Sequence, residues 1–409
     1  MWMGRWLWRC LIWIRRDPGL LWIVLGLLAV VFFSHWPRFA YAVPAVSIED
    51  RSQWQAQWEQ LPADKETGGV LWQAEGSFEI QEDFKSATDA YWQVESGHTL
   101  SWKNSILNAA HERSQLYKLG AGRLAIHTDG LFNGTLHLVE GSLFLAKADI
   151  FGGVADTGVR AYQGTRLEYG PDLQMWGRLD LDTQPISCGA VSCPSSGGQG
   201  PYADGLQWVV DQGVASQYGA IFGDVPVYKL GDGVLHLANI DVGPGMRGDF
   251  HVLQGGLRLA TATGAPIHIH RGARAEVVHA DLAQLYVRSG GRLQVGRHNG
   301  GPGLKVGMDL LLEAGALTEL QRSSRYADRA VIEARPGANI TLDGDLLIGL
   351  TGSGWDPNTR YALIAADDYQ GQFAAYEIQG DIPADHTGTL LYEDGGGLAA
   401  QPGRFFVLN

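Results

Sequence analysis

The sequence predicts an all-β fold, a right-handed single-stranded parallel β-helix that follows an N-terminal signal or anchor helix. Three observations lead to this prediction: a glycine-rich phrase that recurs along the chain, short alternations of aliphatic and polar residues, and the composition. Glycine supplies 55 of the 409 residues, about twice its usual share, whereas proline supplies only 16. Such a composition indicates many tight turns between ordered strands and argues against a disordered chain.

The first 42 residues carry the features of a secretory signal peptide. Arginines precede the apolar run Leu20–Phe33, and Ala40 and Ala42 occupy the two positions that a signal peptidase reads. The run is short for a spanning helix of about 20 residues, so we expect cleavage after Ala42, with an uncleaved membrane anchor as the alternative. Cleavage would remove five arginines and Asp17 and change the net charge from −13 to −13 − 4 = −17. We therefore expect no nucleic-acid partner, and membrane contact only through residues 1–42.

Internal repetition is the strongest signal in the rest of the chain. Residues 117–126 and 228–237 share the phrase Tyr-Lys-Leu-Gly-x-Gly, and residues 134–146 align without gaps to residues 248–260. A weaker copy covers residues 287–295. The two strong copies lie 111 to 114 residues apart, so several smaller structural units must lie between them.

Each copy has the pattern strand, glycine turn, strand. Leu136 and Leu138, then Leu143 and Leu145, alternate with other residues, which is typical of a strand with one buried face. Gly141 stands between the two pairs, where the backbone must turn with positive φ. Repetition favours a solenoid over a sandwich or a barrel, because each coil can bury its inner face only against its neighbours. We expect strands of about three to six residues and coils of roughly 22 residues.

Several segments resemble a known family. Lys118–Leu124 and Val139–Leu145 resemble the passenger repeat of autotransporters, and the order of motifs over residues 68–182 is similar to the β-helical stem of serine protease autotransporters of the immunoglobulin A protease type. Thr359–Ile364 with Gly371–Phe373 resembles the end of many passengers. The resemblance implies the following division: 1–42 signal peptide or membrane anchor, 43–66 N-terminal cap or linker, 67–350 β-helix stem, and 351–409 final coils of the passenger.

The departures from this family bear on function. Its members carry a chymotrypsin-like protease with a Gly-Asp-Ser-Gly loop and end in a translocator barrel, and neither is matched in this sequence. Ser353, in Gly-Ser-Gly-Trp, lacks the preceding aspartate, so we expect a polar turn there. The resemblance thus implies a stalk without catalytic activity or cofactor, exported from a Gram-negative-type cell to the cell surface, the medium or the periplasm. It would remain in the inner membrane if the signal is not cleaved.

The expected role is structural or adhesive, with a host-surface protein or glycan as the partner and a separately encoded translocator barrel for export. Two alternatives remain open. The chain is a non-catalytic fragment of a split or truncated serine protease autotransporter, or it is a β-helix enzyme that acts on polysaccharide. The second alternative would use paired carboxylates. Asp180 with Asp182 and Asp343 with Asp345 have strand spacing, but we expect a solvated acidic face, because acidic residues are spread evenly and no cluster of histidine or arginine joins them.

Two short motifs are candidate sites in the expected stalk. Cys188 and Cys193 are predicted to close a small loop by a disulfide, with free thiols as the alternative, because no histidine or further cysteine flanks them to complete a metal site. The tripeptide Arg247-Gly248-Asp249 matches the sequence that integrins read. Chance explains one such match in a glycine-rich chain, and the alignment of the two copies gives this glycine a structural role instead.

Histidines and tryptophans offer two further alternatives. His268 and His270 lie on the same face of a predicted strand, where they could bind a metal ion, but we expect that face to be solvated and predict no metal site. The N-terminal tryptophans either stack on sugars or cap the first coil, and capping is the expected role because an open coil edge invites aggregation. These residues are Trp54, Trp58, Trp72, Trp92 and Trp102.

Overall fold

The computed structural model describes most of the chain after the predicted signal segment, and the described residues from Pro44 onward form one compact unit. They are 43–61, 69–85, 88–103, 106–107, 115–128, 132, 134–146, 151, 157–183, 201–242, 246–296, 302–323, 329–351, 361–380, 386–393 and 397–404. The predictions for residues 1–42, including Ala40 and Ala42, and those for Cys188, Cys193 and Ser353 lie outside these ranges. Within them, no helix is both long and apolar enough to cross a membrane.

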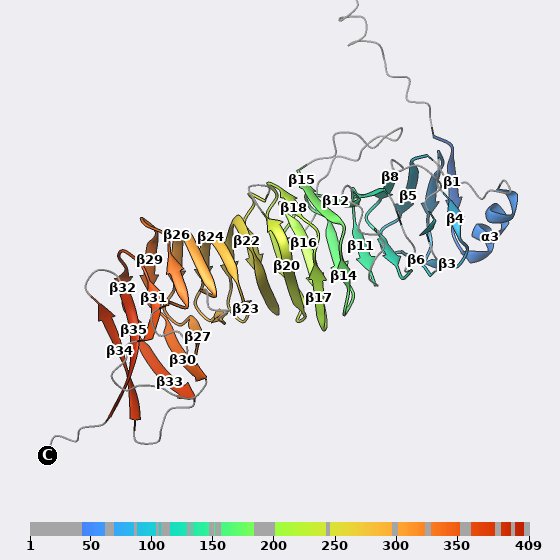
Figure 1. Ribbon diagram of the computed structural model, residues 1–409. Helices are drawn as coiled ribbons and strands as arrows, with labels where there is room; N and C mark the ends of the chain where they lie inside the picture. Colours follow the sequence, from blue (N-terminus) through green and yellow to red (C-terminus); the bar gives the residue numbers. More distant parts are fainter. Residues whose placement is uncertain are drawn as a thin grey trace, which may run out of the picture. The chain divides into compact units, whose positions relative to one another are not determined.

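The strands stack side by side in parallel, one coil on the next (Figure 1). The first sheet contains β1 (Ala45–Ile48), β2 (Leu71–Ala74), β5 (Ala90–Val94), β8 (Gln115–Leu119), β10 (Thr135–Leu138), β12 (Gly158–Tyr162), β15 (Arg178–Asp182) and β18 (Ile221–Gly223). Leu116 of this sheet pairs with Leu136, which pairs with Val159, which pairs with Leu179. These partners are 20, 23 and 20 residues apart, close to the expected coil length. The predicted parallel β-helix is therefore confirmed.

Two further runs of parallel strands form the other sides of the coils. One contains β3 (Phe78–Ile80), β6 (Thr99–Trp102), β9 (Arg123–Ile126), β11 (Ser142–Leu145), β13 (Arg166–Tyr169), β16 (Leu206–Val210), β19 (Val227–Leu230), β21 (Phe250–Val252) and the end of β22 (Gly256–Ile269). The other contains β14 (Gln174–Met175), β17 (Val214–Gln217), β20 (Val234–Val242), the start of β22, β23 (Arg274–Val277), β25 (Arg292–Val295), β27 (Leu317–Ser323), β30 (Asp345–Thr351) and β33 (Ala375–Gly380).

Later coils contain long strands that serve two sides of a coil. They add β24 (Ala280–Val287), β26 (Leu304–Leu312), β28 (Ile332–Ala334), β29 (Asn339–Leu342), β31 (Tyr361–Ala365) and β32 (Gln370–Gly371), while β4 (Phe84–Lys85) and β7 (Ile106–Leu107) form a short pair. The expectation of short strands throughout was wrong here, since β22 has 14 residues and β26 has 9. In β22 the backbone stays extended through a corner of the coil. The pairing register shifts there between Thr263 and Pro266, and no turn interrupts the strand.

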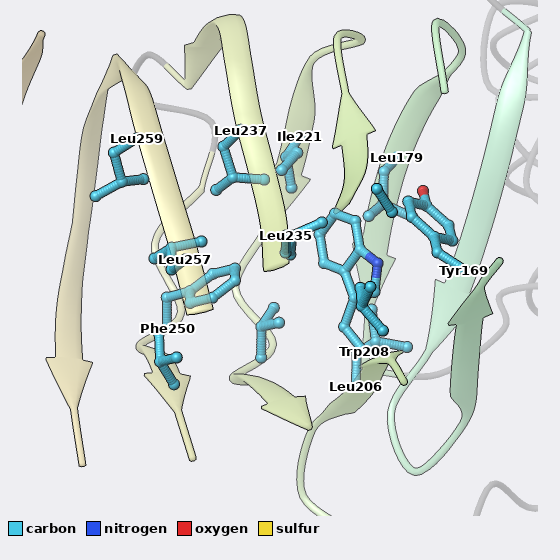
Figure 2. Packing of buried hydrophobic residues seen from close by; sticks show 14 of the residues in the cluster. Tyr169, Leu179, Leu206, Trp208, Ile221, Leu235, Leu237, Phe250, Leu257 and Leu259 are labelled. Carbon is cyan, nitrogen blue, oxygen red and sulfur yellow. The ribbon is translucent and has the colours of Figure 1, made fainter. Parts of the chain in front are cut away.

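The inward side chains form a continuous apolar core. Leu136, Leu138, Leu257 and Leu259 are all at most 1% exposed, as the alternating pattern predicts. Figure 2 shows Leu257 and Leu259 beside Leu235 and Leu237 of the preceding coil, with Trp208 further along the same interior. Aliphatic side chains of successive coils therefore bury one another, which is the main stabilising term that the fold offers.

Glycines form the corners between consecutive strands of a coil, as predicted. Gly141 and Gly255, equivalent residues of the two sequence copies, have φ of +72° and +66°. A Cβ at Gly141 would lie 2.4 Å from the carbonyl oxygen of Gly122, and one at Gly255 would lie 2.4 Å from that of Gly231. Both the backbone conformation and the close approach of neighbouring coils thus require glycine.

The two ends of the stack are covered in different ways. At the start, α3 (Arg51–Gln60) begins at the N-cap Asp50 and buries Trp54 against the first coils. The Trp54 ring lies 5.3 Å from Trp72 and 5.5 Å from Trp92, and with Trp102 all four are buried, so they cap and fill the core and cannot form an exposed sugar-stacking patch. At the other end, β34 (His386–Glu393) and β35 (Gly397–Arg404) form an antiparallel hairpin, and β35 pairs antiparallel with β31.

Candidate functional site

A ladder of aromatic rings lines the outer side of the coils around β21. Parallel pairing in register places Tyr228, His251, His268 and Tyr286 at successive positions of one outward-facing column. Their ring centroids are 5.1, 4.6 and 4.7 Å apart in that order. The spacing follows from the distance between neighbouring strands, which is about 4.8 Å. The column therefore brings together two histidines that are 17 residues apart in sequence.

The two ladder histidines meet polar groups on either side. Nε2 of His268 lies 3.4 Å from Oδ2 of Asp249, and its Nδ1 lies 3.3 Å from the guanidinium of Arg288. Nδ1 of His251 lies 3.1 Å from Nε2 of His270. One ligand atom each from Asp249, His251 and His268 lie within 4.8 Å of one another, so these are the described residues that could hold a metal ion.

Burial keeps the histidines of this site neutral at physiological pH. It lowers the pKa of His268 to about 4, and the neighbouring His251 and Arg288 lower it further against the opposing effect of Asp249. Burial also lowers the pKa of His251 and of His270. Neutral imidazole is the form that binds metals. The expectation that His268 faces solvent was wrong, because it is only 9% exposed between the rings stacked on it.

The three residues of the tripeptide Arg247-Gly248-Asp249 lie in three different environments. Arg247 is exposed, whereas Gly248 is buried, and a Cβ on it would lie 2.3 Å from the carbonyl oxygen of Val225. The structural role expected for this glycine is therefore present. Asp249 keeps 47% of its side chain exposed but faces His268. In the sequence, Asp249 and His268 belong to two separate motifs. Only the strand register shows that their side chains lie close together.

Two buried lysines, one in each copy of the repeated phrase, were not foreseen as a site. Lys118 and Lys229 stand in the inner column, each next to a buried tryptophan of the preceding coil, Trp92 and Trp208 respectively. Alternation from Leu116 would have placed Lys118 inside, so the signal was present in the sequence.

Each lysine donates three hydrogen bonds to backbone carbonyl oxygens around the glycine corners. The acceptors of Lys118 are Leu119 (2.8 Å), Gly120 (2.5 Å) and Glu140 (3.0 Å). The acceptors of Lys229 are Gly231 (2.6 Å), Gly233 (2.8 Å) and Gln254 (3.1 Å). Burial lowers the pKa of Lys118 to about 7 and that of Lys229 to about 8. Three acceptors match the three donors of an ammonium group, so these lysines tie corners of adjacent coils together.

The carboxylates considered for catalysis lie on the outer side of their strands. Asp180 pairs with Arg178 at 2.6 Å and with Arg160 at 3.4 Å, and Asp182 also lies 3.4 Å from Arg160. Asp343 and Asp345 are exposed. The first pair is thus arranged as an ion-pair network along neighbouring coils, which is a structural role.

No family model and no curated protein matches the sequence. Function must therefore be inferred from the described residues themselves.

Proposed function

We propose that this protein is an exported β-helical stalk of the autotransporter-passenger type, with a structural or adhesive role at the bacterial surface. The observation that carries the proposal is the reuse of one coil design. Lys118 and Lys229 both donate to the carbonyl oxygen two residues on and to one in the next coil, at Glu140 and Gln254 respectively. Gly141 and Gly255 have the same positive-φ conformation at two different corners of the coil. A chain that repeats a coil in this way builds length, because each added coil extends the stack by about 4.8 Å.

Both ends of the coil stack are covered, which favours a stalk that does not associate with other copies of itself. An exposed sheet edge offers unpaired N–H and C=O groups to other chains. Trp54 of α3 is buried over the first coils, and β35 pairs along the edge of β31. The side chains between the two ends then present an extended surface from which a partner could be bound.

Export can be tested with the full chain in a Gram-negative host. We expect the protein to leave the cytoplasm, to lose residues 1–42, and to become accessible to protease added outside the cell or in the periplasm. Mass spectrometry of the intact product gives the cleavage site, and replacing both Ala40 and Ala42 by leucine should block processing without affecting coil formation. Retention of the unprocessed protein in the cytoplasm would contradict the proposal.

The adhesive role needs its own assay. Binding of the exported protein to immobilised host-surface glycoproteins and glycans should fall when Arg247 is replaced by alanine if the tripeptide takes part. Arg271→Ala is the matched control, because Arg271 is also exposed but lies in a turn at the opposite end of the paired strands β21 and β22. Equal binding by both variants would exclude the tripeptide as the contact, and absence of binding by the unmodified protein would contradict the adhesive role.

A further inference from the structure

The strongest unexplained cluster outside the core is the group formed by Asp249, His251 and His268. Asp249 comes directly before β21, His251 lies within β21, and His268 is the register partner of His251 in β22. Three ligand atoms of the types that transition metals prefer, one carboxylate oxygen and two imidazole nitrogens, thus meet on two neighbouring strands. Rigid strands hold two of the three ligands, as a precise metal site requires.

One ligand–ligand distance already matches that of a tetrahedral zinc site. Zinc binds nitrogen at about 2.0–2.1 Å, which places two ligand atoms of a tetrahedron about 3.3–3.4 Å apart. His268 Nε2 and Asp249 Oδ2 already have this separation, at 3.4 Å. The widest pair is within 4.8 Å, so closure needs a shift of little more than 1 Å. Rotation of Asp249, whose side chain is 47% exposed, adjusts its distances to both histidines. The His251 and His268 rings are stacked with 21° between their planes, so one ring must also turn about χ2 for both lone pairs to point at one ion.

Nε2 of His268 is the group that most needs a ligand. It is buried and forms no hydrogen bond within the described part of the chain, and its approach to Asp249 meets only the distance of an ion pair. A buried nitrogen without a hydrogen-bond partner destabilises its surroundings, and a neutral ring gains little from a carboxylate at that distance. A bound cation would satisfy both the nitrogen and the carboxylate.

The surrounding groups orient the ligands and set a limit on affinity. His270 Nε2 lies 3.1 Å from His251 Nδ1, so when Nδ1 donates this hydrogen bond, Nε2 of His251 keeps the lone pair that a metal needs. Arg288 opposes binding, because its guanidinium lies 3.3 Å from Nδ1 of His268. Metal binding at Nε2 of the neutral His268 ring requires its proton to stand on Nδ1, where it no longer accepts from Arg288, and Arg288 then keeps Glu313 as its partner at 2.6 Å.

We infer that Asp249, His251 and His268 form a binding site for Zn²⁺ on the outer side of the β-helix, with the fourth position left to water. The site replaces the sequence-based expectation that His268 and His270 only face solvent. It does not depend on the proposed stalk function, and it gives Asp249 a role other than recognition by integrins.

The test is a titration of the untagged full chain with Co²⁺ and then with Zn²⁺. We expect one equivalent of Co²⁺ to produce the intense visible bands of tetrahedral coordination, and Zn²⁺ to remove them. Asp249→Asn and His268→Gln should each weaken Co²⁺ binding at least about 100-fold, since each removes a ligand. His137→Gln should leave it unchanged. This buried histidine stacks on Tyr117 in a similar ladder and also has an unsatisfied Nε2, but among the described residues it belongs to no group of potential metal ligands.

Circular dichroism separates loss of the site from loss of the fold. If His268→Gln unfolds the protein, Asp249→Asn decides the question, because its half-exposed side chain can change without disturbing the core. Absence of tetrahedral bands in the wild type would overturn the inference. So would Co²⁺ binding that is equally strong in Asp249→Asn, because the 12 histidines of the chain would then bind the metal elsewhere.

Discussion

Replacing Gly141 by alanine tests how closely the coils are packed at their corners. Gly141 has φ of +72°, and an added Cβ would lie 2.4 Å from the carbonyl oxygen of Gly122 and 2.5 Å from that of Gly120, both in the preceding coil. A left-handed conformation costs alanine about 1–2 kcal/mol, and overpacking adds about 1–3 kcal/mol. The substitution also displaces Gly120 O, which accepts a hydrogen bond from Lys118. We therefore expect the free energy of unfolding to fall by about 2–5 kcal/mol.

Gly97→Ala is the matched control for this substitution. Gly97 has φ of +82°, but no atom lies within 4 Å of the position of an added Cβ. Only the backbone penalty of about 1–2 kcal/mol should apply to it. Gly255→Ala, in the second sequence copy, should instead match Gly141→Ala, because its added Cβ meets Gly231 O at 2.4 Å and Gly233 O at 2.5 Å.

The assay is urea unfolding of the three variants and the wild type, followed by circular dichroism and by tryptophan fluorescence. A solenoid unfolds through coupled neighbouring coils, so the midpoints are compared only where the transition slopes agree. Equal destabilisation by Gly141→Ala and Gly97→Ala would refute the reasoning, because it would show that the neighbouring coil does not constrain the corner.

Three further predictions concern the core, the cap and the buried lysines. Leu257→Ala removes a side chain that is 1% exposed and should lower the free energy of unfolding by about 2–5 kcal/mol, measured by urea unfolding. Trp54→Ala should lower it by about 3–5 kcal/mol and, by opening the first coil, cause self-association visible in sedimentation velocity. Burial lowers the pKa of Lys118 from 10.5 to about 7. The unfolded state therefore binds more protons between those values, and stability should rise with pH from about 7 to about 10, by at most about 5 kcal/mol.

Each of these predictions has a result that would contradict it. Leu257→Ala should not act like a surface change, so an effect below about 0.5 kcal/mol would place Leu257 outside the core. A monomeric Trp54→Ala protein would show that α3 does not protect the coil edge. Lys118→Met should lose only the part of the rise that Lys118 contributes, and the remaining rise should come from Lys229, whose pKa burial lowers to about 8. A pH profile unchanged in Lys118→Met would assign the whole rise to other groups.

Much of the fold follows from local patterns in the sequence. Alternation predicted the inward positions of Leu136 and Leu257, and the glycine between paired alternations predicted the corner at Gly141, because both depend only on residues close together in the chain. The long strand β22 was not predicted, because the corner between Thr263 and Pro266 turns by a register shift, and Gly264 there lacks the positive φ of corner glycines such as Gly255.

The candidate site could be predicted only in part. The alternation of His268 and His270 is visible in the sequence. The contact of His268 with Asp249 and His251 depends on which strands become neighbours. That register is set by the length of each coil, which varies with the loops between strands and cannot be read from one sequence. The position of Lys118 was available from alternation, yet a charged residue on an inner face contradicts hydrophobic patterning unless its carbonyl partners in the next coil are known.

The spacing of coils along the stack is the most direct test of the β-helix itself. One outward-facing column runs through Gln174, Ser216, His236, Arg258, Glu276 and Gln294. Nitroxide labels can be placed at 174 and 276 or at 174 and 294, after serine replaces the three native cysteines, and their separation measured by pulsed electron paramagnetic resonance. Four and five coils correspond to about 19 and 24 Å, so we expect the second distance to exceed the first by about 5 Å. Distances that do not increase by one strand spacing, or that are several times larger, would contradict a parallel β-helix.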